Sequence, residues 1–241
     1  MVWVLECWVI LLQKGTVMDN TNKAFDKVDR VRQRPAVIWG DNGIAGMKAA
    51  FEKLLAIMTV EARDGYGDQI TITVYDDYSI SIQDNGRGIY LGSDDEADLR
   101  WQNIFCSVCT TCIFENLFPK DYSLFDESGV GKDRKNTGLT YDDLDLCALQ
   151  FVTEYMHVII WRDGIESRLS FKKGRSVGGL VRTASNKPSG TYIHLKFDSE
   201  VFSDTILSKE YLQNRIQQLR KVFSKVKIAF LCDSDISMRY K

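Results

Sequence analysis

The hydrophobic positions of the chain repeat with a helical period in four stretches. Residues 46–63 carry apolar side chains three or four positions apart, which predicts a helix with one buried face. The stretches 97–117, 144–153 and 208–225 are also predicted to be helical, and the last of them has the clearest pattern. Residues 30–43, RVRQRPAVIWGDNG, are rich in turn residues and are predicted to form a loop.

In other parts of the chain the hydrophobic period is two. The runs QITITVYD (69–76) and YSISIQD (78–84) alternate on either side of Asp77, which predicts a hairpin. Later come YMHVIIWRDGIESRLSFKKG, GGLVRT and GTYIHLKF, with Asp-Gly and Lys-Gly turns, and then KIAFLCD (227–233). This order predicts the α+β class: a two-layer α/β sandwich with helices on one face of a mixed, mostly antiparallel sheet.

Composition and charge limit the kinds of partner. Of the 241 residues, 44% are hydrophobic and 27% are charged, which is typical of a globular protein with a real core. The formal net charge is -2, so this chain alone is not expected to bind DNA strongly. The apolar segment 2–12 is interrupted by Glu6 and is too short to cross a bilayer, so we expect no membrane association and a cytoplasmic location. We predict an N-terminal extension or arm over residues 1–25 and one domain over residues 26–241.

The clearest chemical signal is SISIQDNGRGIYLG (79–92), in which an alternating strand runs into Asp-Asn-Gly-Arg-Gly. Asp84 places a carboxylate at the end of the strand, where it can accept a hydrogen bond from an exocyclic amine such as that of adenine. Gly86 and Gly88 free the backbone for a positive φ or for close approach of a ligand. Taken alone, the same residues also describe an ordinary Asn-Gly turn with a surface arginine.

Four segments together resemble the GHKL (Bergerat-fold) ATPase family, and within it the N-terminal ATPase domain of gyrase B and topoisomerase IV. VRQRPAVIWGD (31–41) is similar to the family's V-R-x-R-P-x-x-Y-I-G-D segment, and SISIQDNGRGI to its V-x-D-x-G-R-G-I-P box. IIWRDG (159–164) resembles the strand end that carries a pocket arginine, and SGTYIHLKFDSEVF (189–202) resembles the family's G-T-x-V-x-F strand. The resemblance runs from about residue 26 to residue 233.

The resemblance implies an ATP-binding domain and assigns roles to residues of this chain. Asp84 is expected to bind the adenine amine, with Thr191 supporting it through a water, and Arg162 is expected at the mouth of the pocket. The family's proline after the box is Tyr90 here, so the exit of the loop differs. The implied nucleotide-binding residues are Asp84, Gly86, Arg87, Gly88, Ile89, Arg162 and Thr191.

The part of the family's site that hydrolyses ATP is altered in this sequence. The family's first helix carries E-x-x-x-N, in which Glu activates water and Asn binds the Mg²⁺ on the phosphates. Without a gap, these two positions are Lys53 and Ile57 here. A lysine charged at pH 7 cannot take up a proton, and an isoleucine cannot bind a hard cation. A slip of one residue would supply Glu52 as a base but would put Ala56 at the metal position, so we predict no catalytic residue and no metal ligand.

The glycine-rich lid that faces the phosphates in the family is also changed. The corresponding segment reads NTGLTYDDLDL (136–146), with one glycine and the new acids Asp142, Asp143 and Asp145. The nearby ESGVGKD (127–133) keeps two glycines and a lysine and could replace part of the lid, although it lacks the spacing of a P-loop.

Cysteine and histidine patterns are interpreted as structural. Cys106, Cys109 and Cys112 are spaced as in part of an iron–sulfur motif, but they also fit one face of an apolar helix, which we favour. His157 and His194 have no third ligand in view, so no zinc site is predicted.

Three functions remain open from the sequence. The first is an ATP-binding domain like that of gyrase B, which is a component of a type II DNA topoisomerase. Loss of ATP hydrolysis would make such a domain a pseudoenzyme. The second is an inactive GHKL scaffold that binds a protein or forms a dimer. The third is a pocket retuned for another purine-like ligand. The partners implied are a second copy of the chain or a topoisomerase-like subunit.

Overall fold

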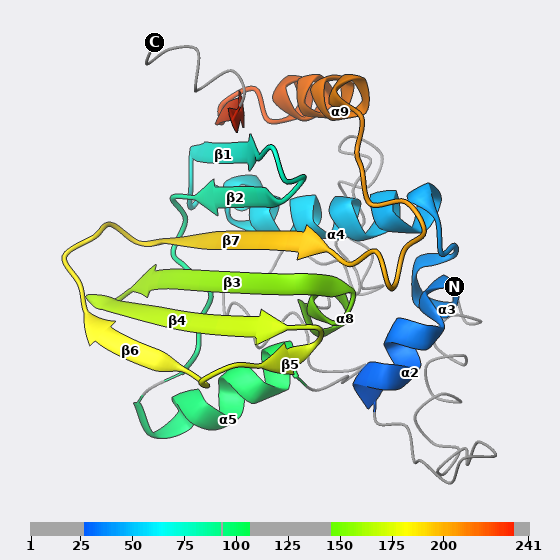
Figure 1. Cartoon of the computed structure of the whole chain (residues 1–241). Coiled ribbons are helices and arrows are strands. Elements are labelled where there is room, and N and C mark those ends of the chain that lie inside the picture. The colour runs from blue at the N-terminus through cyan, green and yellow to red at the C-terminus, as the bar shows by residue number, and fades with distance from the viewer. Residues whose placement is uncertain (1–26, 93, 107–145, 234–241) are drawn as a thin grey trace, which may run out of the picture.

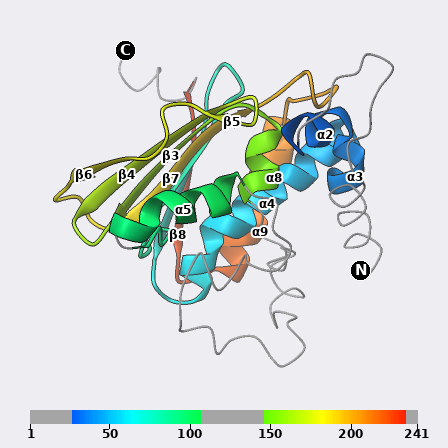
Figure 2. The same ribbon diagram turned by 90° about the horizontal axis from the view of Figure 1, so that it is seen from below.

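The computed structural model describes residues 27–92, 94–106 and 146–233 (Figure 1). Helices cover one face of a single sheet, and the other face of the sheet carries no described helix (Figure 2). The two-layer α/β sandwich predicted from the sequence is therefore confirmed. Within the described residues, no helix combines the length and the hydrophobicity needed to cross a membrane.

In the described part of the chain the sheet has eight strands in the order β5-β4-β3-β7-β2-β1-β8, and β6 pairs with β4 beside this path. Every pair is antiparallel except the parallel pair of β1 and β8. The strands are β1 (Gln69–Val74), β2 (Ile80–Asp84), β3 (Thr153–Arg162), β4 (Ile165–Lys172), β5 (Arg175–Ser176), β6 (Val181–Ala184), β7 (Gly190–Phe197) and β8 (Lys227–Cys232). The hairpins expected around Asp77 and at Asp163–Gly164 are confirmed, and at the second both turn residues have the positive φ that a tight hairpin requires.

The predicted helices 46–63, 144–153 and 208–225 are found as α4, α8 and α9, and 97–117 is found in part as α5, because its second half lies outside the described residues. The helices are α2 (Lys27–Gln33), α3 (Pro35–Trp39), α4 (Ile44–Arg63), α5 (Asp94–Phe105), α8 (Leu146–Phe151) and α9 (Lys209–Val222). The loop predicted for residues 30–43 is wrong, because α2 and α3 fill most of it. Pro35 is the first residue of α3, and Gly40 caps its C-terminal end with a φ of 75°, so the two residues mark the start and the end of a short helix.

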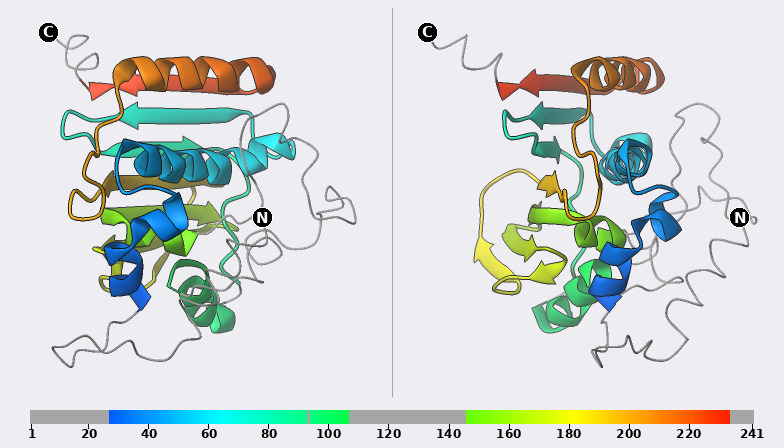
Figure 3. Two further views of the ribbon diagram at one scale, coloured as in Figure 1. Left: turned by 90° about the vertical axis from the view of Figure 1, so that its right-hand side faces the viewer. Right: turned by 45° about the vertical axis from the view of Figure 1, so that its right-hand side comes forward.

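The core lies between α4 and the sheet (Figure 3). Alternate residues of β1 and β2, including the cross-strand partners Ile72 and Ile82, point to this side and are fully buried. On α4 every side chain from Leu54 to Glu61 is buried, whereas Glu52 and Lys53 are partly exposed. The part of α4 from Leu54 to Glu61 is thus enclosed on all sides.

Candidate functional site

Three strand ends meet at one end of the sheet. β2 ends at Asp84, β7 begins at Gly190 and β3 ends at Arg162. The register pairs Ile160 with Thr191 on one side of β7, and β2 pairs with β7 on the other side. The residues that the sequence selected from three separate segments are therefore neighbours in space.

Asp84 has one engaged oxygen and one that is open. Its Oδ1 accepts hydrogen bonds from the backbone N–H groups of Gly86 at 2.7 Å and Thr191 at 3.3 Å. Its Oδ2 accepts none from the described part of the chain. The residue is only 6% exposed, and burial together with the Glu61 carboxylate raises the pKa of Asp84 to about 7, against the effect of the two hydrogen bonds. A buried acceptor held in one orientation, with a free oxygen, suits a ligand that donates a hydrogen bond.

The glycines of the loop let it lie close to its neighbours. A Cβ on Gly86 would come within 2.5 Å of the Glu61 Cβ on α4. Gly88 has a φ of 78°, and a Cβ there would lie 2.6 Å from the Trp161 carbonyl oxygen of β3. The Ile89 N–H donates to the Thr191 hydroxyl at 3.3 Å. The loop is thus clamped between α4, β3 and β7, and no side chain larger than hydrogen fits at Gly86 or Gly88 without a shift.

An ion pair ties the loop to α4. Glu61 accepts from the backbone N–H of Arg87 at 2.8 Å and from its guanidinium at 3.0 and 2.9 Å. The same guanidinium stacks on the Tyr66 ring, 3.4 Å from its centroid. No sequence pattern pointed to Glu61, yet it fixes both the backbone and the side chain of Arg87.

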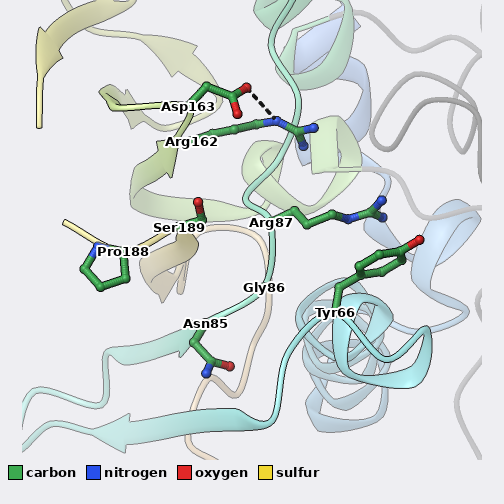
Figure 4. Close-up of a pocket in the computed structure, with 8 residues that line it drawn as sticks. All are labelled: Tyr66, Asn85, Gly86, Arg87, Arg162, Asp163, Pro188 and Ser189. Atoms are coloured by element: carbon green, nitrogen blue, oxygen red, sulfur yellow. Dashed lines mark hydrogen bonds and ion pairs between the residues drawn. The ribbon is translucent and has the colours of Figure 1, made fainter. Parts of the chain in front are cut away.

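A pocket of about 450 Å³ opens beside the loop (Figure 4). Arg162 reaches across from β3, donates to the Gly88 carbonyl at 2.8 Å and pairs with Asp163. The guanidinium carbons of Arg162 and Arg100 lie 4.9 and 4.7 Å from the centroid of the Tyr90 ring. These two contacts hold Tyr90 at the exit of the loop. The lining residues are Tyr66, Asn85, Gly86, Arg87, Arg162, Asp163, Pro188 and Ser189. Sequence reasoning missed Tyr66, Ser189 and Arg100, for which no local pattern gave a signal.

The loop-facing side of α4 offers no metal ligands apart from Glu61. Lys53, Ile57 and Glu61 are four residues apart and share one side of the helix. Ile57 is 4% exposed and apolar, and Glu61 is engaged by Arg87. Among the described residues no three His, Cys, Asp or Glu side chains are grouped to hold a metal ion. The described residues on this side of α4 do not fit Mg²⁺, which needs several oxygen ligands.

Glu52, the alternative base, is held by α9. Its carboxylate accepts from the Arg215 guanidinium at 2.8–2.9 Å and from the Tyr211 hydroxyl at 2.8 Å. These contacts turn it toward α9, away from the loop-facing side of α4. Its oxygens are thus used in a structural ion pair.

We expect Glu52→Gln to destabilise the protein by about 1–3 kcal/mol, because Arg215 is buried and loses a charged partner. Urea unfolding gives the stability and calorimetry gives nucleotide affinity. Affinity is expected to stay unchanged. A loss of binding without a loss of stability would contradict the structural role.

Several sequence-predicted features lie outside the described residues: the lid up to Asp145, the segment 127–133, the N-terminal arm, Cys109 and Cys112. Cys106 directly follows the last residue of α5 and is half-buried. His157 and His194 are cross-strand partners with ring centroids 6.4 Å apart, and each bonds to a serine. Rings on one zinc ion would have to lie closer, since each nitrogen sits about 2 Å from the metal.

Comparison with known proteins agrees with the geometry. No family model matches the chain. The B subunit of DNA topoisomerase 4 from Staphylococcus epidermidis is 29% identical over 218 residues, which cover 90% of this chain and 30% of that protein. The B subunit of the type 2 topoisomerase of Aquifex aeolicus is 26% identical over 209 residues, covering 85% of this chain and 24% of that protein. The chain spans less than a third of the length of these relatives.

Among solved structures, the 43K ATPase domain of Thermus thermophilus gyrase B, in complex with an aminocoumarin, has a TM-score of 0.61 and 21% identity. The alignment covers 86% of this chain and 48% of that one. The likeness shows a shared fold. The resemblance to a GHKL ATPase domain of the gyrase B type, expected from the sequence, is confirmed.

Proposed function

We propose that the chain is an adenine-nucleotide-binding domain of the gyrase B type that binds ATP and does not hydrolyse it. The observation that carries this proposal is Asp84. Its Oδ1 is fixed by two backbone N–H groups, whereas its Oδ2 has no partner within the described part of the chain. An exocyclic amine supplies the donor that such an oxygen lacks. Thr191, at hydrogen-bonding distance from Ile89, completes the base-recognition side.

The loss of hydrolysis is inferred from α4. The loop-facing side of this helix presents Lys53 and the buried Ile57, so it offers neither a general base nor a ligand for Mg²⁺. Glu61 is the acid on that side, and three hydrogen bonds from Arg87 occupy it. The chain is thus proposed to keep the residues that bind the base and to lack those that would hydrolyse the phosphates.

Calorimetry with adenosine and with ATP tests the proposal. We expect both to bind and Asp84→Asn to abolish binding, because an amide in place of Oδ2 meets the adenine amine with a second donor. Asp204→Asn is the matched control, since Asp204 is exposed and bonds only within its own turn. Phosphate release is expected to stay at background. Turnover that needs Mg²⁺ and is lost in Asp84→Asn would overturn the pseudoenzyme assignment.

The relatives are named as subunits of type II topoisomerases, and we propose that this chain likewise associates with a topoisomerase-like subunit or with a second copy of itself. Light scattering with and without ATP measures self-association. No adenosine or ATP binding at millimolar concentration would sink the nucleotide proposal and leave the scaffold interpretation. Tight binding of another purine in place of adenosine would instead favour a retuned pocket.

A further inference from the structure

We propose that Asn85 is a positioning residue for adenine recognition: its side chain clamps the loop to the start of β1 and so fixes the direction in which Asp84 presents its Oδ2 to the base. This inference rests on the proposed function, in which Asp84 binds adenine. It adds Asn85 and its partner Asp68, neither of which is among the nucleotide-binding residues implied by the sequence, to the residues on which affinity depends.

The clamp is formed by both the main chain and the side chain of Asn85. The ladder between β1 and β2 ends with the pair of Ile70 and Asp84. One residue further, the Asn85 N–H donates to the Gln69 carbonyl oxygen at 3.3 Å, and its side-chain Oδ1 accepts from the N–H groups of Asp68 at 3.0 Å and Gln69 at 2.9 Å. The Nδ2 of Asn85 donates to the Asp68 carboxylate at 2.7 Å. A side chain thus continues the strand pairing at the point where the loop begins.

A side-chain amide provides both kinds of contact that this clamp needs. Its oxygen accepts from two N–H groups, while its nitrogen donates to a carboxylate. An aspartate in place of Asn85 would keep the acceptor, but it would lose the donor and would place a second negative charge beside Asp68. The backbone of Asp68 is held in turn, because its carbonyl oxygen accepts from the Lys227 N–H of β8 at 2.7 Å. The clamp is therefore anchored on a strand that is paired on both sides.

The clamp acts on Asp84 through the peptide group that joins Asn85 to Gly86. The N–H of this group donates to Asp84 Oδ1 at 2.7 Å, in the shorter of the two hydrogen bonds to that oxygen. Gly67 packs against the same group, because a Cβ there would lie 3.1 Å from both the Gly86 nitrogen and the Asn85 Oδ1. If Asn85 is released from β1, this peptide group can rotate, and the Thr191 N–H is the one donor that the described residues still provide to Asp84. A carboxylate that can turn binds a ligand less tightly than one held in the required direction.

Exposure separates the clamp from the hydrophobic core. Asn85, Asp68 and Gln69 are all exposed, whereas β1 and β2 are joined in the core by the fully buried pair of Ile72 and Ile82. Removing the Asn85 side chain leaves no cavity in the core, so we expect the fold to persist without it.

Calorimetry with adenosine at pH 8 tests the clamp. We expect Asn85→Ala to weaken adenosine binding about fivefold, which corresponds to the net effect of one hydrogen bond. Asp68→Ala should weaken it in the same direction, although Asp68 is not among the residues that line the pocket in Figure 4. Asn85→Asp is also expected to bind weakly, because two carboxylates then face each other. Combining Asn85→Asp with Asp68→Asn exchanges donor and acceptor, and it is expected to restore most of the affinity.

The pH dependence of adenosine affinity gives a readout that a mere change in stability would not move. Burial raises the pKa of Asp84, and the Gly86 N–H is the strongest of the groups that lower it. If Asn85→Ala loosens this N–H, the pKa of Asp84 increases, and the rise in adenosine affinity moves to a higher pH than in the unchanged protein. Urea unfolding is expected to give nearly the same midpoint for both proteins.

Asn214→Ala is the matched control, because Asn214 is exposed on α9 and its side chain makes no hydrogen bond within the described part of the chain. It should leave adenosine affinity and its pH dependence unchanged. The inference is overturned if Asn85→Ala binds adenosine as tightly as the unchanged protein, or if exchanging donor and acceptor fails to restore affinity. Should adenosine binding by the unchanged protein still depend on Asp84 in that case, the proposed function survives alone. Absence of adenosine binding by the unchanged protein overturns both.

Discussion

Asp84→Asn is expected to stabilise the unliganded protein at pH 8 by about 2–4 kcal/mol, although it removes the group proposed to bind adenine. Burial and the Glu61 carboxylate raise the pKa of Asp84 to about 7 from an ordinary value of 3.8. Each pKa unit corresponds to about 1.4 kcal/mol of preference for the neutral form. Asparagine is neutral at every pH and keeps an oxygen for the N–H groups of Gly86 and Thr191.

The pH dependence of this stability gain follows from the raised pKa of Asp84. The neutral acid favours the folded state fully below about pH 3.8, and this contribution is lost as the pH rises through about 7. The stability gain of Asp84→Asn is therefore small near pH 4 and largest above pH 7. In the same pH range adenosine affinity of the unchanged protein should increase, because the ionised carboxylate is the stronger acceptor.

Urea unfolding at pH 5 and pH 8 measures this effect. Asp198→Asn is the matched control, since Asp198 is equally buried but pairs with the Arg32 guanidinium at 2.6 Å. Its loss is expected to destabilise the protein, because the Arg32 side chain is only 12% exposed and keeps only the more distant Glu200 carboxylate, at 3.5 Å. Equal destabilisation by both variants at pH 8 would contradict the strained carboxylate at Asp84.

The sequence predicted the elements whose pattern is local and periodic. The hairpin of β1 and β2 and the helices α4 and α9 follow from alternation and from helical spacing. The short helices α2 and α3 were missed because the proline that begins α3 and the glycine that caps its end are also turn residues. Local composition cannot separate a capped helix of five residues from a loop.

Site positions could be picked out from the sequence where the backbone conformation requires a particular residue type, such as glycine. Asp84, Gly86 and Gly88 stand out in the sequence, and the structure brings them beside Thr191 and Arg162. Contacts between long side chains were not predictable, because nothing in the spacing of Tyr66 and Arg87 shows that their side chains stack. The sequence therefore identified the strand ends and the loop, and the structure added the side chains that hold them.

Glu61→Gln is expected to destabilise the protein by about 3 kcal/mol, a cost typical of removing one partner from a buried ion pair. Glu61 is 3% exposed, and its carboxylate receives three hydrogen bonds from Arg87. A glutamine of the same shape offers one oxygen and no charge, so at least one of these bonds is lost. Urea unfolding measures the change. Glu154→Gln is the control, because Glu154 is half-exposed and 3.8 Å from its partner Lys196, and it should change stability by less than about 0.5 kcal/mol.

Combining Glu61→Gln with Asp84→Asn in one protein separates two effects of Glu61: its ion pair with Arg87 and its repulsion of Asp84. The Glu61 carboxylate raises the pKa of Asp84, so at pH 8 Glu61→Gln loses the ion pair with Arg87 but also relieves repulsion of the ionised Asp84. In the Asp84→Asn background there is no repulsion to relieve, and Glu61→Gln should cost more. At pH 5, where Asp84 is neutral, the two backgrounds should give the same cost. Equal stability costs of Glu61→Gln in the two backgrounds at pH 8 would mean that the two carboxylates do not interact. Burial alone would then raise the pKa of Asp84.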